Sequence, residues 1–299
     1  MIKKPFAYMG CKGKFWKEIK AVFDENRREN FIDLFGGAME IPLNLKNTYS
    51  DLRVLVNVKD SNLENFLKCK NVLELRERAL KYITQGEQIE NSRLIYQSDK
   101  EKFEKYKRRF KSIFVAICEC CGQPLKKASK SPFTEEEKEI LKLMFGFDGK
   151  GTSLASAFYS VDKTEKFKEY IKALDTVKIQ TELFDENWQF ENSFIFLDPP
   201  YIQKIATDEQ GFVGYDYVTN AGVKWTTQDD ERVVNFIKNN TGKNNVFLIF
   251  GSVENNLAKL LRNNFECDFK IKEYKRSSFG KVVNKAEYFC LIKGGDKMG

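Results

Sequence analysis

The chain has 299 residues, of which 42% are hydrophobic and 31% are charged, and its formal net charge is +7. This length suits one large α/β domain or a core domain with an insertion, and the charge suits a polyanionic partner without requiring one. Because the sequence contains no histidine, imidazole acid–base catalysis and histidine metal sites are excluded. No apolar run could span a bilayer and the N-terminus lacks a signal-peptide stretch, so we expect a cytoplasmic protein that is not bound to a membrane.

The seven cysteines are odd in number and irregularly spaced, which favours reduced thiols over a disulfide framework. Three of them lie in the run Cys118-Glu119-Cys120-Cys121-Gly122, and Cys-x-x-Cys-Gly recurs in zinc-binding turns. A structural zinc site needs four ligands, and the chain has neither a second Cys-x-x-Cys pair nor a histidine to complete one. We therefore expect no metal, and thiols that are buried at a helix end.

The first predicted strand ends in Asp33 and is followed by a turn that contains Gly36 and Gly37. A helix is predicted from about Ala38, and a basic loop with two glycines, residues 5–14, precedes all of these. A strand, a glycine turn and a helix form a cradle for a nucleotide cofactor, because small residues allow close approach and the helix N-terminus offers amide donors. The turn is not the dinucleotide fingerprint, and two glycines alone are a weak signal.

A second predicted strand, residues 53–59, ends at Asp60. An acid at this point, somewhat over twenty residues after the glycine turn, is where Rossmann-like folds bind ribose hydroxyls. Asp60 also suits the N-cap of the next helix, and the two roles are compatible.

A charged helical pattern follows from about residue 66 to residue 111, with a break over residues 85–97. Its densest basic run contains Lys107, Arg108 and Arg109 and interleaves aromatic residues. Such a run is either a solvated helix face or a surface that contacts phosphates.

Three features connect this region to the second half of the chain. They are a short helix through Met144 that begins after Ser131-Pro132-Phe133-Thr134, a hairpin signal at Asp148-Gly149, and a helix over residues 164–174. A short strand is predicted at residues 177–180.

The apolar run 194–197 predicts a strand buried on both faces, and it leads directly into Asp198-Pro199-Pro200-Tyr201. Each proline fixes φ and removes an amide donor, so the four residues form a stiff loop at the carboxyl end of a strand. A carboxylate, a backbone carbonyl and an aromatic ring held in this way suit a planar base with an exocyclic amine. The alternative is an acidic turn that only ends the strand.

The C-terminal part is predicted to contain a helix from residue 226, a buried strand at 245–250 and a helix over 254–263. A closing pair of strands, 269–271 and 286–291, flanks a predicted turn at 277–284. Arg276 and Lys281 then lie in or beside this turn, where they form either a second phosphate-binding surface or a solvated turn.

The order of these motifs resembles that of the Dam-like (alpha group) DNA adenine-N6 methyltransferases. The resemblance rests on the aromatic-x-Gly-x-Lys core Tyr8-Met9-Gly10-Cys11-Lys12, the Asp33 to Gly37 turn, Asp60 and the Asp198 to Tyr201 loop. It covers most of the chain and is weakest over residues 64–175. Two positions depart from the family: Ala38 replaces a usual glycine, and the Asn-x-Pro-Phe-Gly ending of the hairpin is missing.

The resemblance implies a Rossmann-like class I methyltransferase sheet of the α/β class, with a closing antiparallel hairpin and a mainly helical insertion. The catalytic domain would comprise residues 1–63 and 176–295. Residues 64–175 would form the inserted target-recognition region, whose hairpin reads bases in this family.

The same resemblance implies the residues of the site. The cofactor S-adenosylmethionine would be bound by Tyr8, Gly10, Lys12, Asp33, Phe35, Gly36, Gly37, Asp60, Phe184 and Asp198. The catalytic residues would be Asp198, Pro199, Pro200 and Tyr201, and the DNA-binding residues Lys107, Arg108, Arg109, Lys150, Arg276 and Lys281.

The implied activity is site-specific methylation of the N6 amine of an adenine flipped out of duplex DNA, in a bacterial or phage setting. The alternatives are a cytosine-N4 DNA methyltransferase and a DNA-binding relative with weakened catalysis. The implied partners are double-stranded DNA and, in a restriction–modification system, a cognate endonuclease. We expect a monomer or a weak dimer.

Overall fold

The computed structural model describes residues 1–6, 12–87, 98–118, 120–123, 131–145, 164–200, 225–253, 255–278 and 281–293. The chain divides into two compact units. The helical unit comprises Met1–Gly13, Gly37–Leu43 and Ser61–Thr176, and the sheet unit comprises Lys14–Gly36, Asn44–Asp60 and Val177–Gly299.

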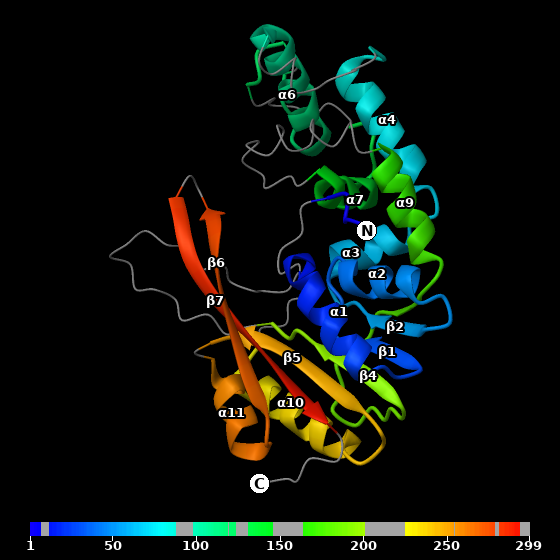
Figure 1. Cartoon of the computed structure of the whole chain (residues 1–299). Coiled ribbons are helices and arrows are strands. Elements are labelled where there is room, and N and C mark those ends of the chain that lie inside the picture. The colour runs from blue at the N-terminus through cyan, green and yellow to red at the C-terminus, as the bar shows by residue number, and fades with distance from the viewer. Residues whose placement is uncertain are drawn as a thin grey trace. The chain divides into compact units, whose positions relative to one another are not determined.

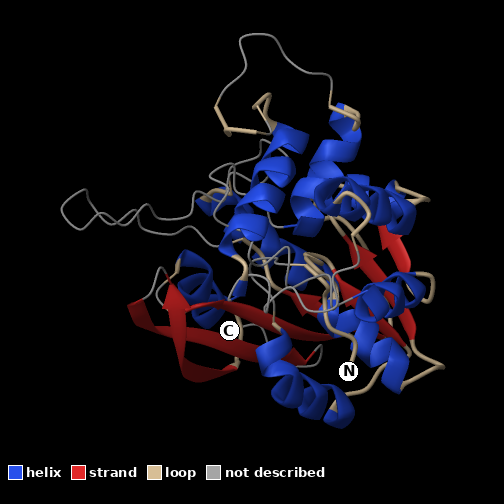
Figure 2. Ribbon diagram, turned by 90° about the horizontal axis from the view of Figure 1, so that it is seen from above, coloured by secondary structure: helices blue, strands red, loops and turns tan. Residues whose placement is uncertain are grey.

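The sheet unit contains one seven-stranded sheet in the order β3-β2-β1-β4-β5-β7-β6 (red in Figure 2). Its strands are β1 (Asn30–Asp33), β2 (Arg53–Asn57), β3 (Lys178–Gln180), β4 (Ser193–Leu197), β5 (Val246–Ser252), β6 (Asp268–Ser278) and β7 (Lys281–Lys293). The first five strands pair in parallel, whereas β7 runs antiparallel to both β5 and β6. The predicted α/β class, with a sheet closed by an antiparallel hairpin, is confirmed.

The strand β4 is buried at all five positions, as its apolar sequence predicts. Because side chains alternate across a sheet, Phe194 points to one face and Ile195 to the other. On the first face Phe194 packs against Phe23 of α1 (Trp16–Glu25), with ring centroids 5.2 Å apart. On the second face Ile195 belongs to the core cluster that includes Phe236.

Two helices of the sheet unit, α10 (Thr227–Asn240) and α11 (Asn256–Asn264), supply that second face and lie together in yellow and orange (Figure 1). The helix predicted from residue 226 begins with a capping box between Thr226 and Asp229. In such a box the two residues satisfy amide groups that a helix end leaves without partners. A short 3-10 helix, Gly13–Phe15, precedes α1, and α2 (Glu40–Thr48) follows the glycine turn.

The closing hairpin is longer than the sequence suggested. Arg276 lies within β6 opposite Val283, and Lys281 begins β7 opposite Ser278. The prediction of a turn over residues 277–284 is therefore wrong. Its Lys, Ser and Asn residues are typical of turns, but antiparallel strands with one solvated face accept polar residues as readily.

The helical unit contains α3 (Ser61–Lys68), α4 (Val72–Thr84), α6 (Lys100–Phe114), α7 (Glu135–Phe145) and α9 (Thr164–Leu174). α4 packs against α6 and α7, and α3 packs against α7. Fully buried aromatic residues fill this unit, among them Phe66, Tyr106, Phe110 and Tyr170. The predicted break over residues 85–97 lies mostly outside the described residues, and α9 has the bounds that the sequence predicts.

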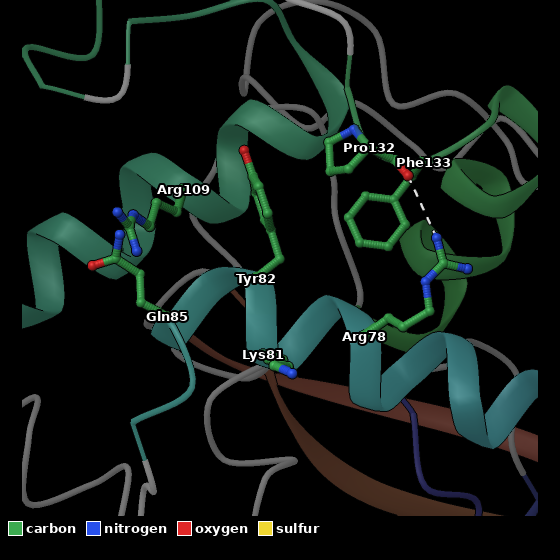
Figure 3. Close-up of a pocket in the computed structure, with 7 residues that line it drawn as sticks. All are labelled: Arg78, Lys81, Tyr82, Gln85, Arg109, Pro132 and Phe133. Carbon is green, nitrogen blue, oxygen red and sulfur yellow. Dashed lines mark hydrogen bonds between the residues drawn. The ribbon is translucent and has the colours of Figure 1, made fainter.

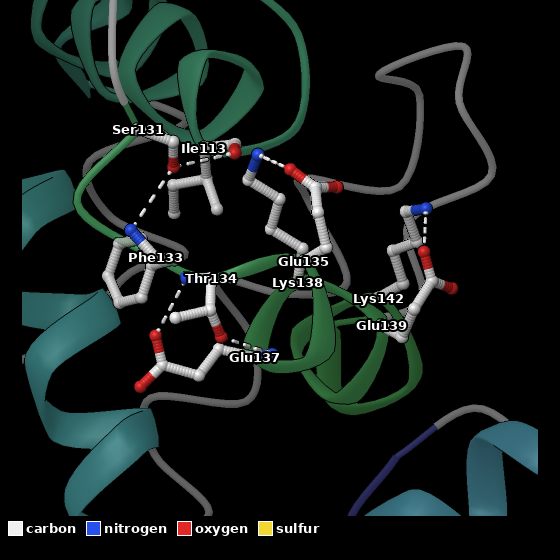
Figure 4. A network of polar contacts seen from close by, with 9 residues as sticks. All are labelled: Ile113, Ser131, Phe133, Thr134, Glu135, Glu137, Lys138, Glu139 and Lys142. Carbon is white, nitrogen blue, oxygen red and sulfur yellow. Dashed lines mark hydrogen bonds and ion pairs between the residues drawn. The ribbon is translucent and has the colours of Figure 1, made fainter.

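The start of α7 is also a capping box (Figure 4). The Thr134 hydroxyl accepts from the Glu137 amide at 3.2 Å, and the Glu137 carboxylate accepts from the Thr134 amide at 2.9 Å. The Ser131 hydroxyl donates to the Ile113 carbonyl at 3.1 Å, which fixes this segment against the end of α6. Among the described residues, no helix is long and apolar enough to cross a bilayer.

Candidate active site

Three neighbouring strands end at the same edge of the sheet. Asp33, the last residue of β1, pairs with Val56 on one side and Phe196 on the other. The loops that follow β1, β2 and β4 therefore leave the sheet side by side, at the edge where open α/β sheets bind ligands. These loops carry the glycine turn, Asp60 and Asp198.

The turn after β1 is held by hydrogen bonds on both sides. The buried Asp33 carboxylate accepts from the Phe35 amide at 3.2 Å, and the Leu34 amide donates to the Phe196 carbonyl at 3.3 Å. Gly36 lies so close to β2 that an added Cβ would be 2.1 Å from Val56 Cγ1. Glycine is required here by close approach to the neighbouring strand.

Asn57, the last residue of β2, is a member of this site that the sequence analysis missed. Its buried side chain donates to the Leu34 carbonyl at 3.2 Å and to the Glu182 carbonyl at 3.1 Å, and it accepts from the Glu182 amide at 3.0 Å. The Asn57 carbonyl also accepts from the Gly36 amide at 2.9 Å. One asparagine thus fixes both the glycine turn and the loop after β3. The only signal in the sequence is a polar residue within an apolar run.

The loop after β3 brings Phe184 against the glycine turn. The Phe184 and Phe35 ring centroids are 5.1 Å apart, and the Trp225 ring meets Phe35 edge-on at 5.5 Å. Arg232 of α10 donates to the Phe184 carbonyl at 2.5 Å, which fixes the backbone at that point. Phe184 is mostly buried in the core, so it can offer only an edge to a ligand.

In the helical unit, the Lys12 side chain is buried, with 6% of its surface exposed. Next to it, a Cβ on Gly13 would lie 2.6 Å from the Glu40 carboxylate. The Ala38 carbonyl, at the family's usual glycine position, accepts from the Tyr170 hydroxyl at 3.1 Å. The left-handed backbone conformation falls one residue later, at Met39, where φ is 53°.

The loop after β4 is described as far as Pro200. Asp198 and Pro200 are half-buried and Pro199 is buried. Tyr201 lies outside the described residues, as do Tyr8, Gly10 and Lys150. For Arg276 and Lys281 only the strand pairing given above is described.

The three basic side chains of the α6 run have different surroundings. Lys107 pairs with Glu104 of its own helix at 3.2 Å, and Arg108 lies 3.4 Å from the Cβ position of Gly122. Arg109 instead lines a pocket of about 460 Å³ within the helical unit.

Three cationic side chains surround this pocket (Figure 3): Arg78 and Lys81 of α4, and Arg109 of α6. The rings of Tyr82 and Phe133 form part of its wall, 5.9 Å apart and edge-on. Arg78 is held in place by the Glu137 carboxylate at 2.7 Å and by the Pro132 carbonyl at 3.4 Å. The pocket therefore offers a cationic, aromatic surface within the helical unit.

The expectation that the cysteines after α6 are buried is wrong. Cys118 is half-buried, whereas Cys120 and Cys121 are exposed. Hydrogen bonds from the Cys120 thiol and from the backbone amides of Cys121 and Cys120 lower the pKa of Cys118 to about 7.

Comparison with known proteins identifies the family. The family model described as D12 class N6 adenine-specific DNA methyltransferase matches residues 8–276 of the chain. The chain belongs to this family. The family resemblance inferred from the motifs is confirmed, and the chain is an adenine-specific DNA methyltransferase. The cytosine-N4 alternative is not supported.

No curated protein matches the chain. A crystal structure of precorrin-6y C5,15-methyltransferase from Geobacter metallireducens GS-15 is similar, with 7% identity and a TM-score of 0.36 over 98% of this chain and 95% of that chain.

Membership of a methyltransferase family implies use of S-adenosylmethionine, and the residues around the glycine turn fit that cofactor. Asp60 and Asp198, both half-buried at the same edge, are acceptors suited to the hydroxyl and ammonium groups of the cofactor.

Proposed function

We propose that this D12 class methyltransferase acts on an adenine rotated out of duplex DNA, and that Asp198 and Pro199 hold its N6 amine. The observation that supports this proposal is the position of Asp198. It follows the buried strand β4 directly, at the sheet edge where β1 ends in the glycine turn. An adenine inside a duplex cannot reach such an edge, because its N6 amine is paired and stacked.

The chemistry requires a correctly oriented amine. The Asp198 carboxylate and the Pro199 carbonyl each accept one amine hydrogen, which directs the nitrogen lone pair toward the methyl donor. The carboxylate also stabilises the positive charge that develops on the nitrogen as it is methylated. S-adenosylmethionine supplies an electrophilic methyl group when bound. Positioning and electrostatics suffice, so no covalent enzyme intermediate is needed.

Two catalytic roles rest on the sequence pattern. Pro200 would restrict the backbone of the loop, and Tyr201 would stack on the flipped base. Base stacking on an aromatic ring contributes about 1–3 kcal/mol, which helps to offset the cost of flipping.

We assign cofactor binding to the strand ends described above. Asp60 would bind the ribose hydroxyls, and the turn formed by Asp33, Phe35, Gly36 and Gly37 would cover the methionine part. Phe184 would offer its edge to the cofactor's adenine. Lys12, together with Tyr8 and Gly10, would complete the site from the N-terminal segment, and Asp198 would contact the cofactor as well as the base.

We assign target recognition to the helical region, residues 64–175. The pocket lined by Arg78, Lys81 and Arg109 suits a DNA phosphate, because each cation that contacts phosphate releases counterions. Phosphate contacts position a protein on the duplex without reading its sequence. The proposed main contact with DNA phosphates is therefore made by Arg109 and its α4 neighbours Arg78 and Lys81, and not by the whole basic run of α6.

The test uses a duplex whose target adenine is replaced by 2-aminopurine, once the methylated motif is known. Flipping should raise the fluorescence of the wild-type complex with this duplex. On the unmodified duplex, Asp198→Ala should lower single-turnover methylation by at least about a hundredfold. Asp51→Ala is the matched control, because Asp51 is 76% exposed and precedes β2 at the opposite edge. Methylation of single-stranded DNA alone, or full activity of Asp198→Ala, would contradict the proposal.

A further inference from the structure

Three cysteines follow α6, and the proposed methyltransferase site uses none of them. The sulfur atoms of Cys118, Cys120 and Cys121 all lie within 4.8 Å of one another. Among the described residues, this is the one group of three or more Cys, Asp or Glu side chains arranged to hold a metal ion. Two of the three thiols are exposed, so a metal ion could reach them from solvent.

The backbone around these cysteines is folded into a closed turn. The Gly122 amide donates to the Cys118 carbonyl at 2.7 Å, and the Cys118 amide donates to the Gln123 carbonyl at 2.8 Å. Gly122 has a φ of 74°, in the left-handed region that favours glycine. These hydrogen bonds hold the backbone that carries the three thiols in one compact turn.

The spacing of the sulfurs fits a single ion. Zinc–sulfur bonds of about 2.3 Å in a tetrahedral site place the sulfurs about 3.8 Å apart. Sulfurs within 4.8 Å reach that spacing by a movement of about 1 Å or less, which a small rotation of the exposed Cys120 and Cys121 side chains supplies.

We propose that Cys118, Cys120 and Cys121 bind one thiophilic divalent cation, Zn²⁺, through three thiolates, with a water molecule in the remaining position. Each metal–sulfur bond replaces a sulfur–hydrogen bond, and the displaced protons go to solvent. No electron is transferred. Sites with three protein ligands and one open position are an established type of zinc coordination, so the missing fourth protein ligand does not exclude binding.

The site would act on the helical unit in which it lies. The Cβ position of Gly122 is 3.4 Å from Arg108, so the cysteine turn rests on the last turns of α6. A metal ion that binds only the folded turn stabilises that contact by mass action. Removal of the metal should therefore lower the melting temperature of the protein.

The experiment uses the full chain, reduced with a phosphine and freed of metal, and titrates it with Cd²⁺ as a spectroscopic substitute for Zn²⁺. We expect thiolate-to-metal charge-transfer absorption that saturates at one equivalent, displacement of Cd²⁺ by Zn²⁺, and a higher melting temperature with metal. Cys118→Ser, Cys120→Ser and Cys121→Ser should each weaken the affinity at least tenfold and reduce the absorption by about a third, since one of three thiolates is lost.

Cys69→Ser is the matched control, since Cys69 is a half-buried thiol of the same unit, and it should leave the titration unchanged. Absence of a saturable band in the wild-type protein would overturn the proposal without any variant. It would also be overturned if the band survived both Cys120→Ser and Cys121→Ser, or if the affinity for Zn²⁺ were weaker than micromolar, because the metal would then be bound only adventitiously.

Discussion

At the scale of single residues, Asn57 does most to organise the edge of the sheet where the chemistry is placed. Its side chain hydrogen-bonds to the backbone of both neighbouring loops, at Leu34 and at Glu182. The Asn57 side chain is buried. If its hydrogen bonds were removed, water could replace them only by entering the core. The glycine turn is therefore held by a residue that need not touch a ligand.

We predict that Asn57→Ala lowers the free energy of unfolding by about 2–3 kcal/mol, because it leaves the buried Leu34 carbonyl and the partly buried backbone of Glu182 without these partners. It should also weaken S-adenosylmethionine binding about tenfold or more, because the turn loses its support. Denaturant unfolding and calorimetric titration measure the two effects. Asn187→Ala changes an exposed asparagine in the same loop region and should alter neither quantity by much.

Gly36 gives a second prediction at this scale. Gly36→Ala should destabilise the protein by about 1–3 kcal/mol, because the new methyl group would overlap Val56. Combining it with Val56→Ala should cost less than the sum of the two single changes, and a double-mutant cycle on unfolding free energies measures this coupling. Strict additivity would show that the contact does not determine the need for glycine.

The sequence predicted the residues whose chemistry shows in a local pattern. Asp198 and the glycine turn are recognisable because prolines, glycines and an acid interrupt apolar strands at the points where those strands end. Asn57 gave no such pattern, since its role depends on Glu182, which lies 125 positions away in the chain. Contacts at that separation arise from the parallel pairing of β2 and β3, which periodicity does not reveal.

At the scale of secondary-structure elements, α10 carries a buried acid. Asp230 is 3% exposed, accepts from the Trp225 indole at 2.9 Å and from the Asn256 amide at 3.2 Å, and burial raises its pKa above the usual 3.8. The folded state thus holds this proton more tightly than the unfolded state does.

We predict that Asp230→Asn gains stability relative to wild type as the pH rises. Below pH 3.8 both side chains are neutral and the difference in unfolding free energy is smallest. As the pH rises from 3.8 through the raised pKa of Asp230, the folded wild-type protein must ionise this buried carboxyl. The free energy of unfolding of the wild type therefore falls over this range, whereas that of the variant does not change for this reason. Urea unfolding at several pH values checks the sign, and a difference independent of pH would contradict it.

Element boundaries were predicted well where capping residues mark them and poorly where only composition was available. Thr134 and Thr226 mark the starts of α7 and α10, because each forms a capping box with the residue three positions later. The hairpin β6–β7 has no such marker. The length of this hairpin depends on how far the two strands pair with each other. Polar residues at its end neither favour nor prevent such pairing.

At the scale of the whole molecule, the proposed function assigns different tasks to the two compact units. Cofactor and base are assigned to the strand ends, and the phosphate contacts are assigned to the pocket in the helical unit. Changes in the pocket should therefore affect DNA binding and leave cofactor binding intact.

We predict that Lys81→Ala and Arg109→Ala each weaken DNA binding for all sequences alike and each reduce the slope of log affinity against log salt by about 1. Affinity for S-adenosylmethionine should stay unchanged. Lys168→Ala is the matched control, because Lys168 is an exposed lysine of the same unit that pairs with Glu165. An unchanged salt slope in both pocket variants would remove the pocket from the DNA-binding surface.

The most direct test of the account is base-by-base sequencing of genomic DNA, by a single-molecule method that detects N6-methyladenine, from cells that express the wild-type chain, Asp198→Ala or Asp51→Ala. We predict N6-methyladenine in one short motif with the wild type and with Asp51→Ala, and none with Asp198→Ala. Equal methylation by Asp198→Ala, at matched expression, would contradict the assignment of the chemistry to the carboxyl end of β4.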